Sequence, residues 1–464
     1  QFFNDAPVIS VPGRLHPVER LYLRQPAPDM LGAVVQAVVD VHLEAGDDPG
    51  DILVFLTGQE DIELVARVLT ERARSAGWQL LPAPIYAALP GADQALIFRP
   101  TPLGCRKVVL ATNIAETSIT VDGIRVVIDS GLVKQRAFDP RTGIDSLVVT
   151  ACSRASAEQR AGRAGRTGPG RCLRLYTRDC FSEEMPSETV PEIQRSNLAS
   201  VALFLKCLGV DDVLQFDFVD APPPDLMARS LSDLYALGAL AGSDGSVTQL
   251  GVLLGEFPLD PHLARAVLEG WRVGCASETV IITAMIANEM TLFETGSKQE
   301  KGPGNRKPFE SPDGDHFRLL LVFNEWVNAE RSERWAASNG LSQRALLQAD
   351  NIRRQLTDIV ARNREAIGEI FGTPAEAPAN DAATIAAIKR VFTTAFPRNV
   401  AVLDRSGLSY RLAGAASGKQ QRQVWLHPSS CLASNLSDRM ATRPPPRRVL
   451  FHDILCTSKE YLRT

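Results

Sequence analysis

The sequence predicts a multidomain fold in which an α/β domain with a parallel sheet precedes a winged helix, a helical bundle and a small β-barrel. Three features of the chain lead to this prediction. Its 464 residues are too many for one core, since a domain usually holds roughly 100–200 residues. Apolar strand-like runs alternate with helical spacing before residue 182, and mostly helical patterns follow. Beyond residue 390 the chain turns to short strands.

The α/β domain is predicted from short apolar runs that are separated by helical spacing. The runs are rich in β-forming residues and lie at 51–56, 107–111 and 124–129. Residues 60–76 place apolar side chains three and four positions apart, as a helix requires. Buried strands that alternate with helices indicate a parallel sheet. Ligands of such sheets bind beyond the carboxyl ends of the strands, where Thr57 and Thr112 lie.

A winged helix is predicted after residue 182. Helical stretches at 196–208 and 225–238 precede a tight turn at 242–245, and a short strand follows at 247–250. Two helices and a small hairpin in this order are typical of a winged helix.

The rest of the chain is predicted to form a helical bundle and then the barrel. Residues 251–292 and 314–370 are largely helical in pattern, and a polar loop at 296–315 separates them. A linker rich in Ala and Pro follows at 373–383. The short strands of the barrel are expected at 399–403, 408–412, 424–427 and 449–455.

Composition narrows the class of protein and its compartment. A net charge of −4 argues against a surface that is basic throughout, but residues 125–178 hold eleven Lys or Arg and only four Asp or Glu. Their local net charge of +7 suits a polyanion. The eight cysteines include no C-x-x-C pair and are sparse, so we expect neither a zinc site nor disulfides, and a reducing compartment, nuclear or cytoplasmic. No apolar run approaches the ~18 residues of a membrane span, so no membrane partner is expected.

The strongest chemical pattern is the string Gln-Arg-Ala-Gly-Arg-Ala-Gly-Arg at 159–166. Helical spacing puts Gln159, Arg163 and Arg166 on one face and turns Arg160 away from it. Two adjacent guanidiniums offer planar, forked donors that never lose their charge, which suits a polyphosphate. In phosphoryl transfer such arginines stabilise the charge on the transferring group. The pattern therefore predicts a site for a polyphosphate.

Two features of this helix lead to further expectations. Gly162 and Gly165 each cost roughly 1 kcal/mol relative to Ala in a helix, so we expect the backbone to approach a ligand or a neighbouring domain closely. Ser156 and Gln159 fit a capping box, which would give Gln159 a second role at the start of the helix.

A second pattern crowds polar residues after a buried strand, at 111–123. Its hydroxyl and amide groups can contact phosphate oxygens. Each of the two patterns also has an alternative explanation without a ligand. Residues 111–123 could form a polar loop with helix caps, and the arginines of 159–166 could pair with carboxylates such as Asp129 and Asp145.

Together these strings resemble a known family, the DEAH-box RNA helicases. Its motifs IV, V and VI are similar to 57–63, 111–123 and 159–166, in this order. Its winged helix, ratchet domain and OB-fold are similar to the segments at 191–195, 312–316 and 427–430. The resemblance therefore covers nearly the whole chain.

The resemblance implies a RecA-like parallel sheet followed by a winged helix, a helical ratchet and an OB-fold. The implied parts are a second RecA-like domain at 1–182 (with 1–11 as the tail of a first one), a winged helix at 183–250, a ratchet domain at 251–372, and an OB-fold at 384–464 that the chain end either truncates or just completes.

The resemblance also implies roles at a nucleotide. Gln159, Arg163 and Arg166 would be catalytic and would face the nucleotide, with the two arginines on the β- and γ-phosphates. Phe98 matches the aromatic residue that stacks on adenine, with core packing as its alternative, and Asp122 matches a residue near the ribose.

A third set of positions is implied to contact RNA. The residues that match contacts to the RNA backbone are Thr57, Gly58, Thr112, Asn113 and Thr117. The segment 134–149, with its turn at 139–143, matches a β-hairpin that helps to separate duplexes.

Two motifs of the family do not occur in the chain. There is no G-x-x-x-x-G-K-[ST] string to cradle phosphates and no Asp-Glu-Ala-His string to hold the metal. The resemblance therefore implies that ATP, or another NTP, and Mg²⁺ are held mainly by a first RecA-like domain that lies before Gln1. The chain alone is expected to be inactive and to hold no metal.

The implied activity is ATP-driven RNA unwinding or remodelling of RNA–protein particles. The implied partners are single-stranded RNA, an RNP assembly and a glycine-rich G-patch activator protein. One alternative is a non-catalytic RNA-binding scaffold derived from a helicase, and another is a DNA helicase. The paired arginines favour an enzyme, since a scaffold has no evident use for them.

Overall fold

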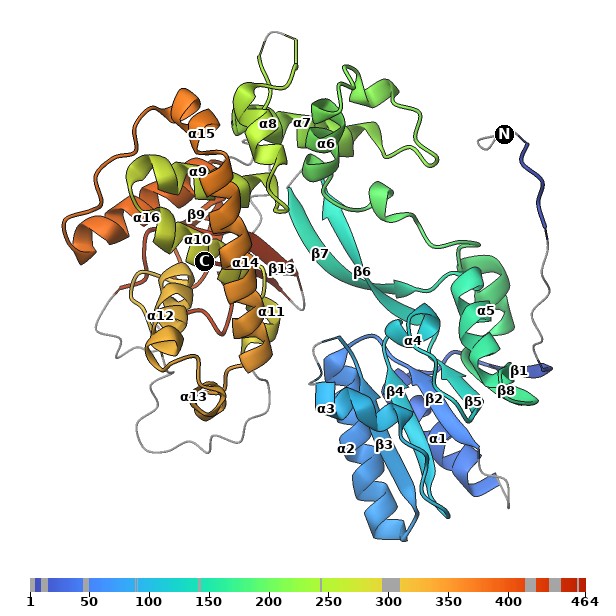
Figure 1. Ribbon diagram of the computed structural model, residues 1–464. Coiled ribbons are helices and arrows are strands. Elements are labelled where there is room, and N and C mark those ends of the chain that lie inside the picture. Colours follow the sequence, from blue (N-terminus) through green and yellow to red (C-terminus); the bar gives the residue numbers. More distant parts are fainter. Residues whose placement is uncertain are drawn as a thin grey trace. The chain divides into compact units, whose positions relative to one another are not determined.

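The computed structural model describes residues 5–9, 16–44, 50–87, 89, 91–140, 143–242, 244–293, 309–413, 423–433, 444–456 and 459–464 (Figure 1). The chain divides into two compact units. One unit comprises Gln1–Gln135 with Val148–Val190, and the other comprises Arg136–Leu147 with Pro191–Thr464. Among the described residues, no helix combines the length and the apolar character needed to cross a bilayer.

The first unit is built on a six-stranded parallel sheet in the order β1-β8-β5-β2-β4-β3. Its strands are β1 (Val18–Leu23), β2 (Asp51–Phe55), β3 (Leu80–Ile85), β4 (Arg106–Ala111), β5 (Ile124–Asp129) and β8 (Gly170–Thr177). Helices α1 (Met30–Glu44) and α2 (Gln59–Ala76) cover one face, where Val38 and Ile62 pack on Val54. The other face carries the 3₁₀ helix η1 (Ala95–Phe98) and α5 (Arg154–Gly162). The predicted parallel sheet is thus confirmed.

Strands β2, β4 and β5 are the three that the sequence predicted, and they lie inside the sheet. Strand β3 was missed because Pro82 and Pro84 interrupt its pattern. It is an edge strand, where a residue without an N–H is tolerated. Strands β1 and β8 were missed as well.

The predicted hairpin is confirmed as the two-stranded sheet of β6 (Leu132–Asp139) and β7 (Ile144–Ala151). Its tip, Arg136–Leu147, belongs to the second unit. There Phe138 is buried in the same apolar cluster as Leu198, and its N–H donates to the Arg195 carbonyl at 2.8 Å. The tip is therefore anchored in the core of the second unit.

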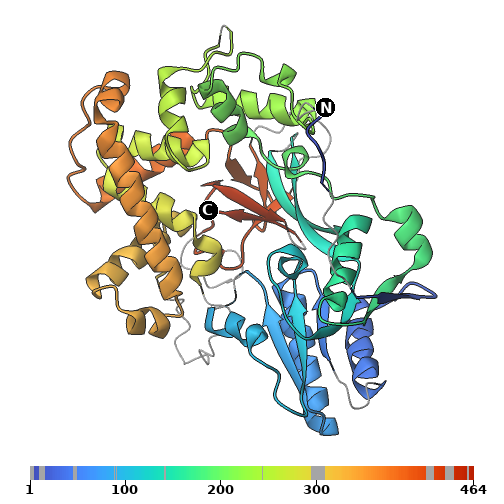
Figure 2. The same ribbon diagram turned by 45° about the vertical axis from the view of Figure 1, so that its right-hand side comes forward.

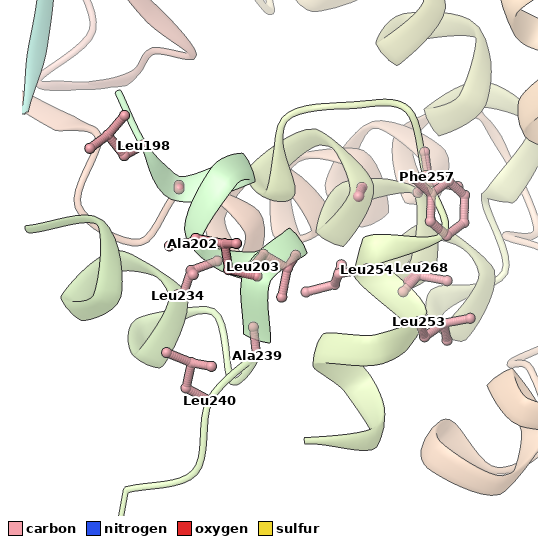
Figure 3. Close-up of a cluster of buried hydrophobic side chains, with 14 of the residues drawn as sticks. Leu198, Ala202, Leu203, Leu234, Ala239, Leu240, Leu253, Leu254, Phe257 and Leu268 are labelled. Atoms are coloured by element: carbon pink, nitrogen blue, oxygen red, sulfur yellow. The ribbon is translucent and has the colours of Figure 1, made fainter. Parts of the chain in front are cut away.

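The second unit begins with a helical module around one apolar cluster (Figure 3). Helices α6 (Ala199–Cys207) and α7 (Pro224–Ala236) bring Leu203 and Leu234 into this cluster. The expected hairpin is reduced to a single bridge between Leu240 and Val247. The hydroxyl of Thr248 caps the next helix by accepting from the Gly251 N–H, so the predicted strand at 247–250 was wrong beyond its first residue.

The predicted helical bundle follows and is confirmed. Its helices are α8 (Gln249–Gly255), α9 (Pro261–Val273), α10 (Ala276–Ile286), α11 (Glu289–Leu292), α12 (Asp315–Asn328), α13 (Glu333–Ser338), α14 (Gln343–Arg362) and α15 (Arg364–Phe371). A further helix, α16 (Asp381–Ala395), was not predicted, and it begins inside the expected linker at 373–383. The apolar stripe of α14 buries Leu356 and Ile359 in the same cluster as Leu203 and Leu234. The expected loop at 296–315 lies mostly outside the described residues.

The chain ends in a curled mixed sheet in the order β12-β9-β10-β11-β14-β13, drawn in orange-red to red in Figure 2. Its strands are β9 (Val400–Leu403), β10 (Tyr410–Leu412), β11 (Gln423–Leu426), β12 (Arg448–Leu450), β13 (Asp453–Cys456) and β14 (Glu460–Arg463). The run at 449–455 was predicted as one strand, but it splits at Phe451 and His452, and β14 was not predicted. The small barrel is otherwise confirmed.

Candidate nucleotide and nucleic-acid site

The helix that carries the arginines starts earlier than a capping box at Ser156 requires. The hydroxyl of Ser153 caps α5 by accepting from the Ser156 N–H at 3.1 Å. Ser156 and Gln159 therefore lie inside the helix, and the predicted cap was wrong by one turn. Gln159 is exposed, so its amide is not used at the helix start.

The helix also ends earlier than predicted. The α-helix stops at Gly162, and the 3₁₀ helix η2 (Arg163–Gly165) continues it. Gly165 lies against β1, where the His16 N–H donates to the Gly165 carbonyl at 2.9 Å. A Cβ on Gly165 would lie 2.7 Å from the His16 carbonyl oxygen. The backbone at Gly165 thus makes the expected close approach, but it approaches strand β1 of the same unit and not a ligand or a neighbouring domain.

Both arginines of the pattern reach the polar segment at 111–123. Arg163 Nη1 donates to the Ile119 carbonyl at 3.2 Å, and Arg166 Nη1 donates to Thr120 Oγ1 at 2.6 Å. Burial lowers the pKa of Arg163, and so does the positive charge of Arg166. Within the described part of the chain, neither guanidinium has an ion pair with a carboxylate. Two like charges held in this way favour a bound polyanion.

Arg160, in contrast, is a structural residue. It is 1% exposed, and its guanidinium pairs with Asp129 at 2.8 Å and with Glu116 at 3.1 Å. Its guanidinium also lies over the Phe55 ring, 5.0 Å from the centroid. Burial alone would lower the pKa of Arg160, but the charge of Asp129 raises it. The pairing with Asp129 that was considered for the arginines therefore holds for Arg160.

Phe98 does not pack in the core. Its neighbour Ile97 fills that position and is 1% exposed, whereas Phe98 is 59% exposed. The Lys107 ammonium fixes this turn by donating to the carbonyls of Ile97 at 2.9 Å and Arg99 at 2.7 Å. The Phe98 ring is therefore available to a ligand.

The nucleotide candidates lie toward the amino-terminal edge of the sheet. Asp122 is exposed just before β5, and Arg166 precedes β8. Phe98 is held near the start of β4, because Lys107 is the second residue of that strand. The parallel strands all start at this edge. The nucleotide candidates are therefore separated from the nucleic-acid candidates, which follow the ends of the strands.

The nucleic-acid candidates lie at the carboxyl edge. Thr57 and Gly58 follow β2, and Thr112 follows β4, its hydrogen-bonded neighbour. Asn113 and Thr117 are exposed at the two ends of the short helix α4 (Ile114–Thr117). The edge therefore offers backbone, hydroxyl and amide groups together, which suits contacts to a sugar–phosphate chain.

Two side chains modify this edge. The Thr57 hydroxyl donates to the Asp61 carboxylate, so Thr57 is oriented by α2. Lys134 of β6 is the first residue of the predicted hairpin segment 134–149, but it was not assigned a contact of its own from the sequence. A Cβ built on Gly58 would lie 3.9 Å from its Nζ, which brings a cation to the edge. Only the basic composition of 125–178 hinted at it, since a lone lysine has no spacing signal.

No metal centre is evident in the described ranges, where no three His, Cys, Asp or Glu residues are grouped to hold an ion. The donors that remain for a nucleotide are the Gln159 amide and the guanidiniums of Arg163 and Arg166. These groups suit phosphate oxygens rather than a metal.

Comparison with protein families matches four segments of the chain. They are the helicase conserved C-terminal domain at 33–168, the winged-helix part of the helicase associated domain HA2 at 230–259, its ratchet-like part at 260–319, and an oligonucleotide/oligosaccharide-binding (OB)-fold at 388–464. Their order is the order of the parts expected from the motifs.

Individual proteins extend the match over the full chain. The chain is 39% identical to the pre-mRNA-splicing factor ATP-dependent RNA helicase prp22 of Schizosaccharomyces pombe, over 100% of the chain and 38% of that protein. It is 26% identical to the Escherichia coli DExH-box NTPase HrpB, with a TM-score of 0.71 over 99% of the chain and 47% of HrpB. A second structure, of the E. coli DEAH/RHA helicase HrpB, matches with a TM-score of 0.70 at 26% identity, over 99% of the chain and 49% of that structure. The chain thus spans less than half the length of these relatives.

Proposed function

Since this chain belongs to the DEAH/RHA family of helicases, we propose that it works as the carboxy-terminal part of an ATP-dependent RNA helicase. The whole enzyme would couple hydrolysis of ATP, or another NTP, to unwinding of RNA or remodelling of RNA–protein particles. In it, Gln159, Arg163 and Arg166 contribute to the nucleotide site, with Phe98 on the base and Asp122 near the ribose.

The observation that carries this proposal is a pair of arginines that form no ion pair with a carboxylate among the described residues. Arg163 and Arg166 are held by Ile119 and Thr120, so they are positioned before any nucleotide binds. Preorganised charge of this kind stabilises a transition state without further reorganisation. A protein that only binds RNA through Thr57 and Thr112 at the carboxyl edge of the sheet has no need of preorganised positive charge at the opposite edge.

We further propose that the chain alone does not hydrolyse ATP. The phosphate-cradling G-x-x-x-x-G-K-[ST] string and the Asp-Glu-Ala-His string are absent from its 464 residues. Mg²⁺ and most of the nucleotide would be held by a first RecA-like domain. The present chain would then supply the arginines that complete the site.

RNA would bind as a single strand along the carboxyl edge of the parallel sheet. Thr57, Gly58, Thr112, Asn113 and Thr117 supply the contacts, and Lys134 supplies a charge that no sequence motif assigned. Contacts to the backbone give binding that depends on salt and little on sequence.

A role in a nuclear RNP is the proposal that prp22, named as a pre-mRNA-splicing factor, supports. A G-patch activator would be a second partner. The winged-helix surface offers it exposed apolar side chains on α6, directly after it and on α7, namely Phe204, Leu208 and Tyr235, which are 62%, 64% and 57% exposed. Exposed apolar groups gathered on one module are typical of a protein interface.

ATP hydrolysis with and without RNA tests the proposed function. The chain alone should bind single-stranded RNA without turnover, and a protein that adds the preceding RecA-like domain should hydrolyse ATP faster in the presence of RNA. A longer protein that binds RNA but has no ATPase activity would instead support the scaffold. Greater stimulation by single-stranded DNA than by RNA would support a DNA helicase.

A further inference from the structure

The tip of the β6–β7 hairpin is attached within the second unit, although the base of the hairpin belongs to the first unit. One attachment is the buried Phe138, beside which Arg195 Nη1 donates to the Arg136 carbonyl at 3.2 Å. The turn itself is closed by the Gly143 N–H, which donates to the Asp139 carbonyl at 2.7 Å. A second attachment lies at this turn, and the proposed function does not use it.

The guanidinium of Arg229, on α7, lies directly against the turn. A Cβ built on Gly143 would lie 2.5 Å from Arg229 Nη2 and 3.2 Å from its Cζ. Gly143 also has a φ of +71°, in the left-handed region that favours glycine. The turn therefore has a residue without a side chain at the point where the guanidinium approaches it.

Asp233 holds Arg229 in this position. The two residues are one helical turn apart on α7, and Arg229 Nε donates to Asp233 Oδ2 at 3.0 Å. The other carboxylate oxygen, Oδ1, accepts from Arg398 Nη1 at 2.6 Å, and Arg398 Nη2 donates to the Ser232 hydroxyl at 3.0 Å. Asp233 is 7% exposed, so it is a buried carboxylate whose two oxygens serve two different guanidiniums.

Arg398 comes from the carboxy-terminal domain and not from the winged helix. It lies in the turn between α16 and β9, and the next residue fixes this turn on both sides. The Asn399 N–H donates to the Phe396 carbonyl at 3.1 Å, and the Asn399 carbonyl accepts from the Phe451 N–H at 3.1 Å. Phe396 is itself buried in an apolar cluster. Arg398 therefore connects a fixed turn beside the carboxy-terminal sheet to Asp233.

We propose that Arg229, Asp233 and Arg398, which we call the Asp233 network, hold the turn of the hairpin in place for the separation of RNA strands. A hairpin that separates strands has to keep its position while a duplex is drawn against it. Charge-assisted hydrogen bonds suit this task, since they are roughly twice as strong as neutral ones. The three residues would be positioning residues that act through the hairpin and take no part in ATP hydrolysis.

This proposal rests on the proposed function as an RNA helicase and assigns residues of the second unit to its mechanical step. The alternative is a network that only joins the winged helix to the carboxy-terminal domain. Such a network would stabilise the unit as a whole, whereas the proposed one acts locally on the hairpin. Hydrogen exchange separates the two cases, because it reports local opening along the chain.

Hydrogen–deuterium exchange of the whole chain tests the attachment without ATP or RNA. In Arg398→Ala, amides of 136–147 should exchange about 10- to 100-fold faster than in wild type, the factor that corresponds to the loss of one charge-assisted hydrogen bond. Amides of α6 and β9 should exchange as in wild type. Arg398→Lys keeps a cation near Asp233 and should lie between the two. Arg398 is 43% exposed, so these variants are expected to fold, and thermal melts check this.

Lys389→Ala is the matched control. Lys389 is a 53% exposed cation of α16, the helix that leads to Arg398, and it pairs with Asp313 at 2.6 Å. Its removal breaks an ion pair of similar exposure and length that does not include Asp233. Exchange at 136–147 should therefore stay at the wild-type rate.

The whole helicase, with its first RecA-like domain, tests the link to strand separation. Arg398→Ala and Asp233→Asn should each slow unwinding of a tailed RNA duplex about 10- to 100-fold, and should leave RNA-stimulated ATP hydrolysis unchanged. The double variant should unwind no more slowly than the slower single variant, since residues of one network are not additive.

Three results would overturn the proposal. If Arg398→Ala exchanges at 136–147 as wild type does, or faster throughout the unit, the network does not hold the hairpin. If the hairpin exchanges faster but unwinding keeps its wild-type rate, strand separation does not depend on the network. In both cases an active wild-type enzyme leaves the proposed function standing. A wild-type enzyme that neither hydrolyses ATP nor separates strands would overturn the proposed function, and the role in strand separation with it.

Discussion

Arg166 donates a 2.6 Å hydrogen bond to the Thr120 hydroxyl, and this bond joins two motifs that lie 46 residues apart in the chain. Arg163 makes a parallel contact to the Ile119 carbonyl. Both guanidiniums keep most of their donors, since a guanidinium has five N–H groups. The segment at 111–123 thus orients the arginines for a ligand without neutralising them.

On the proposed function, replacing Arg163 by Ala in the whole helicase should abolish ATP turnover. An arginine on the transferring phosphoryl group contributes about 10³–10⁵ in rate, and lysine cannot reproduce its forked geometry. RNA-stimulated ATPase assays should show a loss of this order for Arg163→Ala, while RNA affinity changes little. Unchanged turnover would refute the catalytic role. Arg20→Ala is the control, because Arg20 is an exposed partner of Glu158 on the same unit.

Replacing Arg160 by Met should unfold the first unit instead. It would leave Asp129, which is fully buried, without its cation, and breaking a buried pair costs about 3–5 kcal/mol. Thermal melts of the chain should show a large loss for Arg160→Met and little change for Arg163→Ala. Equal melting temperatures for the two variants would contradict the division between structural and functional arginines.

Phe98 offers a test of nucleotide binding that is separate from catalysis. Phe98→Leu removes the ring from a site that is 59% exposed, so the free energy of unfolding should change by less than about 0.5 kcal/mol. The KM for ATP in the full-length enzyme should rise several-fold, since the base loses its stacking partner, and kcat should change less. Phe98→Tyr, which keeps the ring, should behave as wild type. An unaltered KM for Phe98→Leu would remove Phe98 from the site.

Gly162 and Gly165 look equivalent in the sequence but differ in the structure. Gly165→Ala places a Cβ 2.7 Å from the His16 carbonyl oxygen and from Val18 Cγ2, so it should destabilise the first unit by about 1–3 kcal/mol. A Cβ on Gly162 meets no atom within 4 Å, and its backbone is helical, so Gly162→Ala should be neutral or stabilising by about 0.5–1 kcal/mol. Urea unfolding of the two variants measures the difference. The reverse order would show that the close approach of β1 does not constrain the helix.

These glycines illustrate how far the sequence leads. Helical spacing correctly separated Arg160 from Gln159, Arg163 and Arg166, because a face depends only on position along the helix. It could not tell which glycine meets a neighbour, since the residues that Gly165 approaches, His16 and Val18, lie far away in the chain. The helical spacing was therefore applied through 159–166, although the α-helix ends at Gly162 and the turn Arg163–Gly165 is 3₁₀ in the structure.

The strands show the same division. Strands β2, β4 and β5 are apolar on both faces, and this pattern was sufficient to predict them. Edge strands bury one face at most, and the mixed exposure of β1 and the prolines of β3 leave no clear period. Lys134 at the carboxyl edge could not be predicted either, because its place beside Gly58 depends on the path of the hairpin.

Acid should destabilise the second unit through His316, which is buried against the carboxy-terminal sheet. Its ring stacks on Phe392 with centroids 4.6 Å apart, and its Nε2 lies 3.1 Å from His452 Nδ1. Burial lowers the pKa of His316 to about 3, and the charge of His452 lowers it too, although Glu289 opposes this. The unfolded chain therefore binds a proton near pH 6.5 that the folded chain refuses until about pH 3. The stability of the unit should then fall with decreasing pH across this window, by up to about 1.4 kcal/mol per pH unit.

His316→Gln keeps a polar partner for His452 but does not titrate. Urea unfolding at pH 7.5, 6.5 and 5.5 should show a shallower decline for the variant. An identical decline in wild type and variant would assign the acid sensitivity to other groups.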